Sequence, residues 1–268
     1  MKFDMHTHHE RCGHAAGGIR EYVEAAIAAG LTVIGISDHS PYFGEEEDHP
    51  KPNVAMAKSE FPLYIREVLQ IKDMYKDAIE VLLGIESDFF PDYADIYREV
   101  YQKYPFDYII GSVHVSGGKS IFNRRRWTGL TEEQLIKEKQ LYYDLIQRSA
   151  KSRMFDILGH IDAMKANYPT FVDIKKDIVD QTLQVIAACD VAIEVNTSGK
   201  TKRCGGWYPS DETLERALFY GVKVTFGSDA HDPARVGDEW EIVGKRLKEI
   251  GFREWVFYRQ RRRQAVSL

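Results

Sequence analysis

Seven of the nine histidines in this chain follow segments that are expected to form strands, and an acidic residue is often close by. They are His6, His8, His14, His39, His114, His160 and His231. Imidazole is the commonest metal ligand in proteins. Residues at the ends of many successive strands meet at one mouth when those strands form a barrel. The pattern therefore indicates a polynuclear metal site, and hydrolysis is the first chemistry to consider.

Three short motifs carry most of this signal. The alternation of side chains along a strand places His6 and His8 on one face, where both can bind the same ion. Glu86 comes directly after an apolar strand, and a buried carboxylate needs a cation or hydrogen-bond partners. Asp229 and His231 stand two residues apart after another apolar strand, with small neighbours that leave room for ions. Each motif alone also fits an ordinary structural residue, and it is their recurrence that favours a metal centre.

The other two histidines lack this setting. His9 alternates to the side opposite His8, and His49 lies in an acidic loop beside Pro50. Neither is expected to be a metal ligand, although His9 could still line the pocket.

Helix-like and strand-like segments alternate along the whole chain. The expected strands are residues 2–7, 31–37, 79–85, 107–113, 155–159, 191–195 and 222–226. The expected helices are residues 18–30, 61–76, 92–103, 131–151, 174–189, 210–220 and 234–250, and residues 255–266 are expected to add an irregular strand. About seven βα repeats predict an α/β fold with a parallel sheet closed into a barrel. A flat doubly wound sheet is the alternative, but it would spread the strand ends along a line.

Length and composition agree with one globular unit. The chain has 268 residues, 44% of them hydrophobic and 29% charged, and no linker-like segment divides residues 1–268. A single domain is therefore expected. The net charge of −5 argues against a general nucleic-acid binder, and the runs Arg124–Arg126 and Arg261–Arg263 are local exceptions. The second run is expected to be a solvated stretch of like charge.

Cysteine use and hydropathy bear on the compartment. Three cysteines cannot form a disulfide framework with none left over. The first residues do not resemble a signal peptide, and no apolar run approaches the length of a membrane span. The expected compartment is the cytoplasm, with no membrane partner.

The order of these motifs resembles the polymerase and histidinol phosphatase (PHP) family. The resemblance rests on His6-x-His8, Asp38-His39, Glu86, His114, His160 and Asp229-x-His231, and it runs from the first residues to about Asp232. Within that family, the start from His6 to Ala15 and the chain length are similar to the stand-alone histidinol phosphatases. The resemblance implies a distorted TIM-like (β/α)7 barrel that hydrolyses L-histidinol phosphate.

The resemblance also implies two to three divalent ions, Zn, Fe or Mn, held by nine residues. The first ion would be bound by His6, His8, Glu86 and Asp229. The second would be bound by Glu86, His114 and His160, with Glu86 bridging, and the third by His14, His39 and His231. Donor sets rich in nitrogen suit all three metals.

A mechanism follows from that arrangement. A hydroxide shared by two ions would attack phosphorus, because metal binding lowers the pKa of water from ~16 to about 7. The third ion would neutralise charge that develops on the phosphate. Asp229 and His231 are the candidate catalytic residues for the proton of the leaving alkoxide, and a metal-bound water is an equal alternative.

Substrate contacts are harder to predict. A phosphate monoester favours arginine, and the candidates are Arg203 and Arg124. Ser198 ends a strand and could donate a hydrogen bond to the substrate. Asp162, with Asp38 and Glu10 as alternatives, could bind an ammonium group.

Two other functions stay open. One is another phosphoesterase of this family, such as a sugar or nucleotide phosphatase or a nuclease, and the net charge of −5 weighs against the nuclease. The other is a non-catalytic, metal-binding regulatory module. Because all nine expected ligand positions hold competent residues, the module is less favoured than an enzyme. The sequence does not decide the oligomeric state.

Overall fold

Short parallel strands form a closed barrel in this computed structural model, which describes residues 1–167 and 176–268. One sheet has the order β1-β2-β3 and the other the order β10-β9-β8-β5-β4. The bounds are β1 (Phe3–Asp4), β2 (Val33–Ile36), β3 (Glu80–Leu83), β4 (Glu86–Asp88), β5 (Ile110–Ser112), β8 (Ile157–Leu158), β9 (Ala192–Asn196) and β10 (Val224–Gly227).

Two features join these sheets into one ring. Strands β3 and β4 are separated by two residues only, and they pair with β2 and β5 respectively, so they occupy one position in the wall. At the other seam, the amide of Met5 donates to the carbonyl of Phe226 at 3.0 Å, and the amide of His8 donates to the carbonyl of Ala230 at 2.9 Å. The wall therefore has seven positions within the described residues, as in the distorted (β/α)7 barrel that the sequence predicts.

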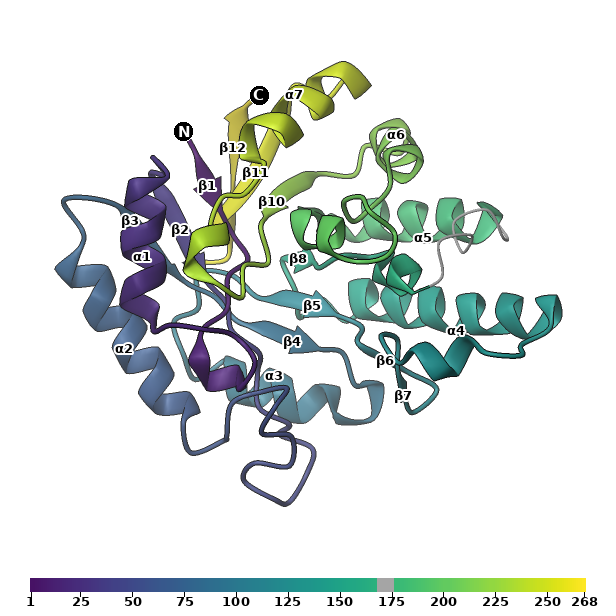
Figure 1. Cartoon of the computed structure of the whole chain (residues 1–268), viewed down its shortest axis with the longest axis horizontal. Helices are drawn as coiled ribbons and strands as arrows, with labels where there is room; N and C mark the ends of the chain where they lie inside the picture. Colours follow the sequence, from purple (N-terminus) through teal and green to yellow (C-terminus); the bar gives the residue numbers. More distant parts are fainter. Residues whose placement is uncertain (168–175) are drawn as a thin grey trace.

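Helices surround the barrel and cover its outer face (Figure 1). Their bounds are α1 (Ile19–Ala28), α2 (Phe61–Met74), α3 (Ala94–Tyr101), α4 (Glu132–Lys151), α5 (Lys176–Cys189), α6 (Asp211–Phe219) and α7 (Trp240–Ile250). Helix α4 begins as predicted, because Thr131 and Gln134 form a capping box. Of the helix expected over residues 174–189, the first two residues lie outside the described part of the chain.

Short turns of 3-10 helix occur between these elements. They are η1 (Glu10–Cys12), η2 (Pro91–Tyr93), η3 (Arg124–Trp127), η4 (Ala163–Ala166), η6 (Thr197–Thr201) and η7 (Pro233–Arg235). The long loop expected after His114 contains η3 and a small hairpin, β6 (Val115–Ser116) and β7 (Lys119–Ser120). Within residues 1–167 and 176–268, no helix combines the length and the apolar character needed to cross a membrane.

The end of the chain differs from the expectation of one irregular strand. It forms a regular antiparallel hairpin of β11 (Glu254–Arg259) and β12 (Arg262–Ser267). Arg261, Arg262 and Arg263 are exposed, as expected for a solvated run, but two of them also form ion pairs. Arg261 Nε lies 2.6 Å from Asp156 Oδ2, and Arg263 Nη1 lies 2.6 Å from Asp190 Oδ1. The hairpin thus brings two arginines of this run against acidic groups that precede β8 and β9.

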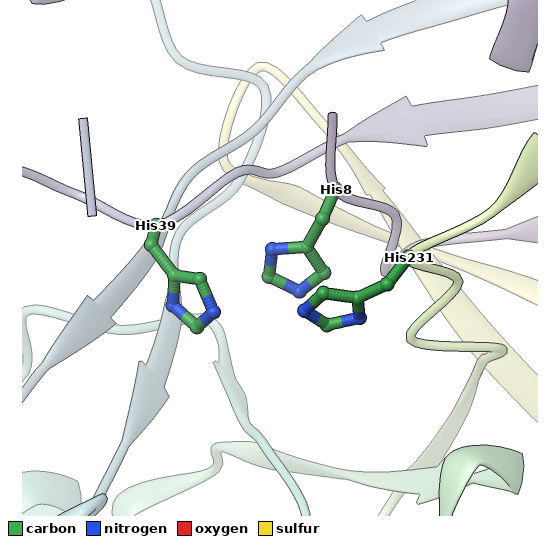
Figure 2. A group of neighbouring side chains, drawn as sticks. All are labelled: His8, His39 and His231. Atoms are coloured by element: carbon green, nitrogen blue, oxygen red, sulfur yellow. The ribbon is translucent and has the colours of Figure 1, made fainter. Parts of the chain in front are cut away.

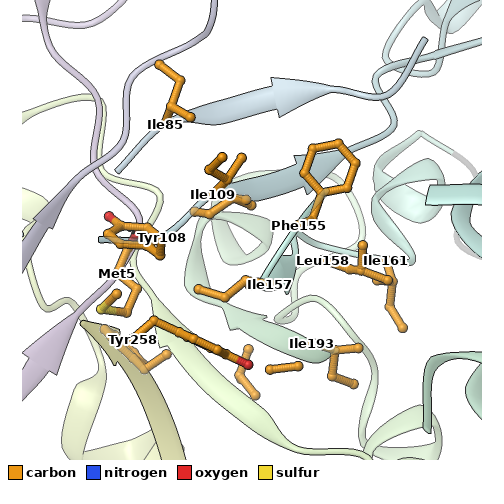
Figure 3. Close-up of a cluster of buried hydrophobic side chains, with 14 of the residues drawn as sticks. Met5, Ile85, Tyr108, Ile109, Phe155, Ile157, Leu158, Ile161, Ile193 and Tyr258 are labelled. Carbon is orange, nitrogen blue, oxygen red and sulfur yellow. Dashed lines mark hydrogen bonds between the residues drawn. The ribbon is translucent and has the colours of Figure 1, made fainter. Parts of the chain in front are cut away.

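Apolar side chains fill the barrel, and Tyr108 lies among them with Met5, Ile109, Ile157 and Tyr258 (Figure 3). Tyr108 is fully buried, and its hydroxyl donates to the carbonyl of Met5 at 2.7 Å. Its ring is accommodated by two glycines, since a Cβ at Gly35 would lie 2.0 Å from its Oη and a Cβ at Gly84 would lie 2.2 Å from its Cζ. Two glycines in the wall therefore make room for one large aromatic core residue, and the polar cluster lies beyond the strands.

Candidate metal centre

Eight of the nine predicted ligands follow the carboxyl ends of strands, and Glu86 follows β3 as the first residue of β4, so all nine gather at one mouth of the barrel. They border a cavity of 580 Å³, whose lining includes His14, His39, Glu86, His114, His160, Asp229 and His231. His6 and His8 are buried directly behind it. Figure 2 shows the rings of His8, His39 and His231 converging from three separate segments, which follow β1, β2 and β10. Residues from the whole length of the chain thus meet at this mouth.

Glu86 is at the centre of the cluster and is 1% exposed. Its Oε2 lies 2.8 Å from His39 Nδ1 and 3.5 Å from His6 Nε2. Its Oε1 lies 3.0 Å from His160 Nε2 and 3.5 Å from His114 Nε2. Oε2 therefore faces His39, His6 and also His8 at 3.7 Å, whereas Oε1 faces His160 and His114, so this one carboxylate could serve two ions.

Asp229 completes the group around the first histidine pair. Its Oδ1 lies 3.0 Å from His8 Nε2 and 3.8 Å from His6 Nε2. His6, His8 and Glu86 also offer ligand atoms that all lie within 4.8 Å of one another. Beside this group, the ring of His231 lies 4.1 Å from that of His8, and the Nε2 atoms of His231 and His14 face each other.

The cluster fits bound cations, because several of its buried polar atoms have no hydrogen-bond partner. These atoms include His6 Nε2 and His160 Nδ1. Buried polar atoms without a partner are rare in folded proteins and cost free energy. The Nε2 atoms of His114 and His160 lie only 3.3 Å apart, and such a contact requires a proton or a metal ion between the two lone pairs. These donors are nitrogen and carboxylate oxygen, which Zn, Fe and Mn accept.

The pKa values of the acidic members favour metal binding. Burial raises the pKa of Glu86, but the surrounding rings, His39 foremost, hold it well below its usual value. Burial also raises the pKa of Asp229, but the nearby histidines, His6 foremost, hold it well below its usual value. Burial lowers the pKa of His231 to about 3. Both carboxylates are thus ionised and His231 is neutral at pH 7, which are the protonation states that ligands need.

Two of the predicted ligands have unusual backbone conformations. His160 has a φ of 26° and Asp229 has a φ of 52°, in the left-handed region that residues other than glycine rarely adopt. Such conformations cost on the order of 1–3 kcal/mol and concentrate at functional sites. The fold therefore tolerates local strain at the two points where these side chains turn into the cluster.

Carboxylates outside the predicted set hold several of the rings in place. Asp38 Oδ1 lies 3.2 Å from His8 Nδ1, and Asp88 Oδ1 lies 3.2 Å from His114 Nδ1. Glu194 Oε1 lies 2.6 Å from His6 Nδ1. Asp88 and Glu194 were not predicted from the sequence, and Asp38 was considered only as a partner for an ammonium group. The available signal was a carboxylate two residues after Glu86, and polar residues at alternate positions of the apolar strand β9.

The predicted substrate residues are placed differently from one another. Ser198 lines the cavity, and its hydroxyl donates to Asp229 Oδ2 at 2.9 Å. Asp162 is 1% exposed and lies 2.8 Å from Lys165 Nζ in a buried ion pair, away from the cavity lining. Arg203 and Arg124 are exposed and are not among the lining residues. Only Ser198 of these four is therefore brought to the cluster.

Other side chains that the sequence analysis did not single out line the same cavity. Lys202 and Arg235 supply positive charge there, and Phe122 and Val54 supply apolar surface. Tyr208 is buried at the wall, with its ring 6.3 Å from that of His160. The cavity thus combines positively charged side chains and apolar surface beside the histidines.

Comparisons with known proteins bear on the family and the fold of this chain. A model of the PHP domain matches residues 4–198. A probable histidinol-phosphatase of Deinococcus radiodurans is 33% identical over 263 residues, which cover 97% of this chain and 98% of the relative. The histidinol-phosphatase of Bacillus subtilis is 28% identical over 267 residues, covering 92% of this chain and 99% of the relative.

A solved structure has the same fold. The histidinol phosphate phosphatase of Lactococcus lactis, crystallised with zinc, L-histidinol and phosphate, superimposes with a TM-score of 0.81 at 22% identity, covering 98% of both chains. This confirms the predicted barrel. Because the family model matches most of the chain and the Deinococcus relative covers nearly all of it, the predicted family is confirmed as well. The chain belongs to the PHP domain family.

Proposed function

We propose that this chain is a metal-dependent phosphatase that hydrolyses L-histidinol phosphate to L-histidinol and phosphate, a step of histidine biosynthesis in the cytoplasm. The observation that carries this proposal is the cluster of seven histidines, Glu86 and Asp229 at the barrel mouth, with its unpartnered buried donors. Relatives named histidinol-phosphatase match nearly the full length of the chain. The Lactococcus lactis protein of the same fold was crystallised with zinc, L-histidinol and phosphate.

The proposed ligand sets are those that the family resemblance implies. The ligand atoms of His39 also come close to those of Glu86 and His114 and to those of His8 and His231. His6, His8, Glu86 and Asp229 would hold one ion, and Glu86, His114 and His160 a second. His14, His39 and His231 would hold a third, and the close approach of His14 to His231 supports it. We propose two to three divalent ions, with zinc, iron and manganese as the candidates.

Bound divalent ions supply a nucleophile by acidifying water, and they neutralise charge on the phosphate. The residues of the chain then have distinct tasks. The carboxylate of Asp229 holds no proton at neutral pH, so it can take a proton up but cannot donate one. Ser198 donates to the other oxygen of Asp229 and keeps that carboxylate turned toward the histidines. Asp229 and His231 remain the proposed catalytic residues, with Asp229 as a proton acceptor. The proton that the leaving alkoxide needs would then come from a water molecule, the alternative already left open.

Positively charged side chains at the cavity are proposed to bind the phosphate. Lys202 and Arg235 line the cavity, and Arg235 is held by Asp238 at 2.8 Å. Arg203 and Arg124 remain candidates that would have to move toward the cavity to reach the phosphate. Phe122, with its ring 5.9 Å from the ring of His114, offers an apolar face to the imidazole of the substrate.

The test is phosphate release from L-histidinol phosphate, compared with sugar phosphates, nucleotides and a short oligonucleotide, by protein whose metal content has been counted. Turnover of histidinol phosphate alone is the expected result. Turnover of another compound would keep the metal centre and change the substrate, whereas a metal-loaded protein without any activity would favour a regulatory module. Glu86→Ala is expected to abolish turnover, because it removes the proposed bridge between two ions.

Single substitutions test the phosphate contacts. Removing one charge-assisted hydrogen bond costs about 1.5–3 kcal/mol, so Lys202→Ala and Arg235→Ala should each raise KM by roughly tenfold or more if they contact the phosphate. Arg203→Ala and Arg124→Ala serve as the comparison. A larger effect at either of these two would move the phosphate contact to that arginine.

A further inference from the structure

Glu194 is a buried carboxylate beside the cluster that neither the sequence analysis nor the proposed ligand sets use. It lies on β9 and is 1% exposed. Its Oε1 is 2.6 Å from His6 Nδ1, while the opposite ring nitrogen, His6 Nε2, faces Glu86 and Asp229 at 3.5 Å and 3.8 Å. Glu194 therefore contacts the side of the ring that points away from the proposed ion.

The second oxygen of Glu194 is also fully engaged. Oε2 accepts from the backbone amide of His160 at 3.1 Å and from Asn196 Nδ2 at 2.9 Å. The same amide group of Asn196 donates to Asp229 Oδ2 at 3.1 Å. One carboxylate is thus connected to three of the proposed ligands, which follow three different strands: His6, His160 and Asp229.

The wall of the barrel is built to let Glu194 reach His6. Strand β10 lies between β9 and the segment that carries His6, and Gly227 is the residue of β10 at the crossing. A Cβ at Gly227 would lie 1.9 Å from Glu194 Oε1 and 2.6 Å from the Cβ of His6. Any side chain at this position would separate the carboxylate from the ring.

We propose that Glu194 is a positioning residue of the metal centre, which fixes the His6 ring with Nε2 directed at Glu86 and Asp229. A carboxylate accepts hydrogen bonds only, so the proton of the neutral ring is placed on Nδ1 and the lone pair on Nε2. Partners of this kind orient metal-binding histidines and raise their basicity. The inference rests on the metal-binding part of the proposed function and is independent of the substrate.

The decisive variant is Glu194→Gln, which keeps the shape of the side chain and replaces one acceptor by a donor. His6 Nδ1, the backbone amide of His160 and Asn196 Nδ2 all donate to Glu194. The side chain of glutamine has one oxygen and one NH2 group, so it cannot accept hydrogen bonds from all three donors. The matched control is Asp107→Asn. Asp107 is also buried, at 2% exposure, and accepts from the amides of Leu83 and Gln260, remote from the cluster.

The measurement is Zn²⁺ affinity of the metal-stripped full-length chain, by competition with a chromophoric chelator and without substrate. Glu194→Gln should weaken the binding of one ion by roughly 10–100-fold, and Asp107→Asn should leave it unchanged. Wild-type affinity in folded Glu194→Gln would overturn the role of Glu194. If the unaltered chain bound no zinc, the metal centre itself would be wrong, and this proposal with it.

Circular dichroism establishes whether each variant is folded. If Glu194→Gln fails to fold, Glu194→Asp decides the question, because it keeps both acceptors but withdraws them from His6. A folded Glu194→Asp protein with weakened zinc binding supports the positioning role. The same variant with unchanged zinc binding contradicts it.

Discussion

The Nε2 atoms of His14 and His231 lie 3.0 Å apart, although 217 residues separate the two histidines in the sequence. The Nδ1 of His14 lies 3.2 Å from the carbonyl of Cys12, and the Nδ1 of His231 lies 3.0 Å from the carbonyl of Asp229. A carbonyl only accepts, so each Nδ1 carries the proton and each Nε2 a lone pair. Two lone pairs at this distance repel each other unless a cation lies between or beside them.

His14→Asn should therefore lower the metal content by one ion per chain. Metal analysis of the protein after removal of loosely bound ions measures this loss. His49→Asn is the control, since His49 contacts the carbonyl of Ala55 outside the cluster and should have no effect on metal content. Equal metal content in His14→Asn and the unaltered protein would remove His14 from the ligand set.

Zinc binding should release protons at pH 7.5. Burial lowers the pKa of His8, but hydrogen bonds to Asp229 and Asp38 outweigh it and raise the pKa to about 9. Burial likewise opposes the charges of Asp88 and Glu86 at His114, whose pKa is raised to about 9. Both rings thus carry a second proton in the metal-free protein at pH 7.5, and an ion must displace it.

Zinc affinity should accordingly rise with pH up to about 9 and level off above it. Titration calorimetry in two buffers of different ionisation enthalpy, both at pH 7.5, measures the number of protons released. Identical heats in the two buffers would mean that no proton is displaced and that the rings are already neutral.

Gly84→Ala should destabilise the barrel core. The added Cβ would lie 2.2 Å from Cζ of Tyr108, which is fully buried and anchored to the carbonyl of Met5. Overpacking of this kind costs about 1–3 kcal/mol of unfolding free energy. Guanidinium unfolding measures it, with Gly206→Ala as the control, because a Cβ at Gly206 meets no atom within 4 Å. Equal stability of the two variants would show that Tyr108 can shift at little cost.

Asp162→Ala should affect stability more than substrate binding. It would leave Lys165 buried without its ionic partner, which costs about 3–5 kcal/mol. Asp73→Ala is the matched control, since Asp73 and Lys76 have the same spacing and a similar separation of 3.0 Å but lie on the surface. Such exposed pairs contribute about 0–1 kcal/mol.

Unfolding midpoints and the KM for histidinol phosphate separate the two roles of Asp162. We expect a lower midpoint and an unchanged KM. A raised KM at an unchanged midpoint would instead support the original prediction that Asp162 binds the ammonium group of the substrate.

The sequence by itself determined the repeating βα pattern, the family and the nine candidate ligands. The reason is that strand periodicity is local, and ligands that follow apolar strands stand next to a signal that can be recognised without a structure. His6-x-His8 and Asp229-x-His231 are ligand motifs of this kind. The capping box of Thr131 and Gln134 is also a local signal, since it lies within four consecutive residues at the start of α4.

Only the tertiary structure decided which groups touch. The contact of Glu194 with His6 crosses 188 residues and depends on the absence of a side chain at Gly227, and nothing near either residue in the sequence indicates it. The same applies to the ion pairs of Arg261 and Arg263 with Asp156 and Asp190, which the hairpin forms while both arginines stay exposed. Asp162 resembles a substrate residue in the sequence, and it is burial beside Lys165 that gives it a structural partner. Burial and long-range pairing are properties of the closed barrel, because they depend on which strands become neighbours when its two edges join.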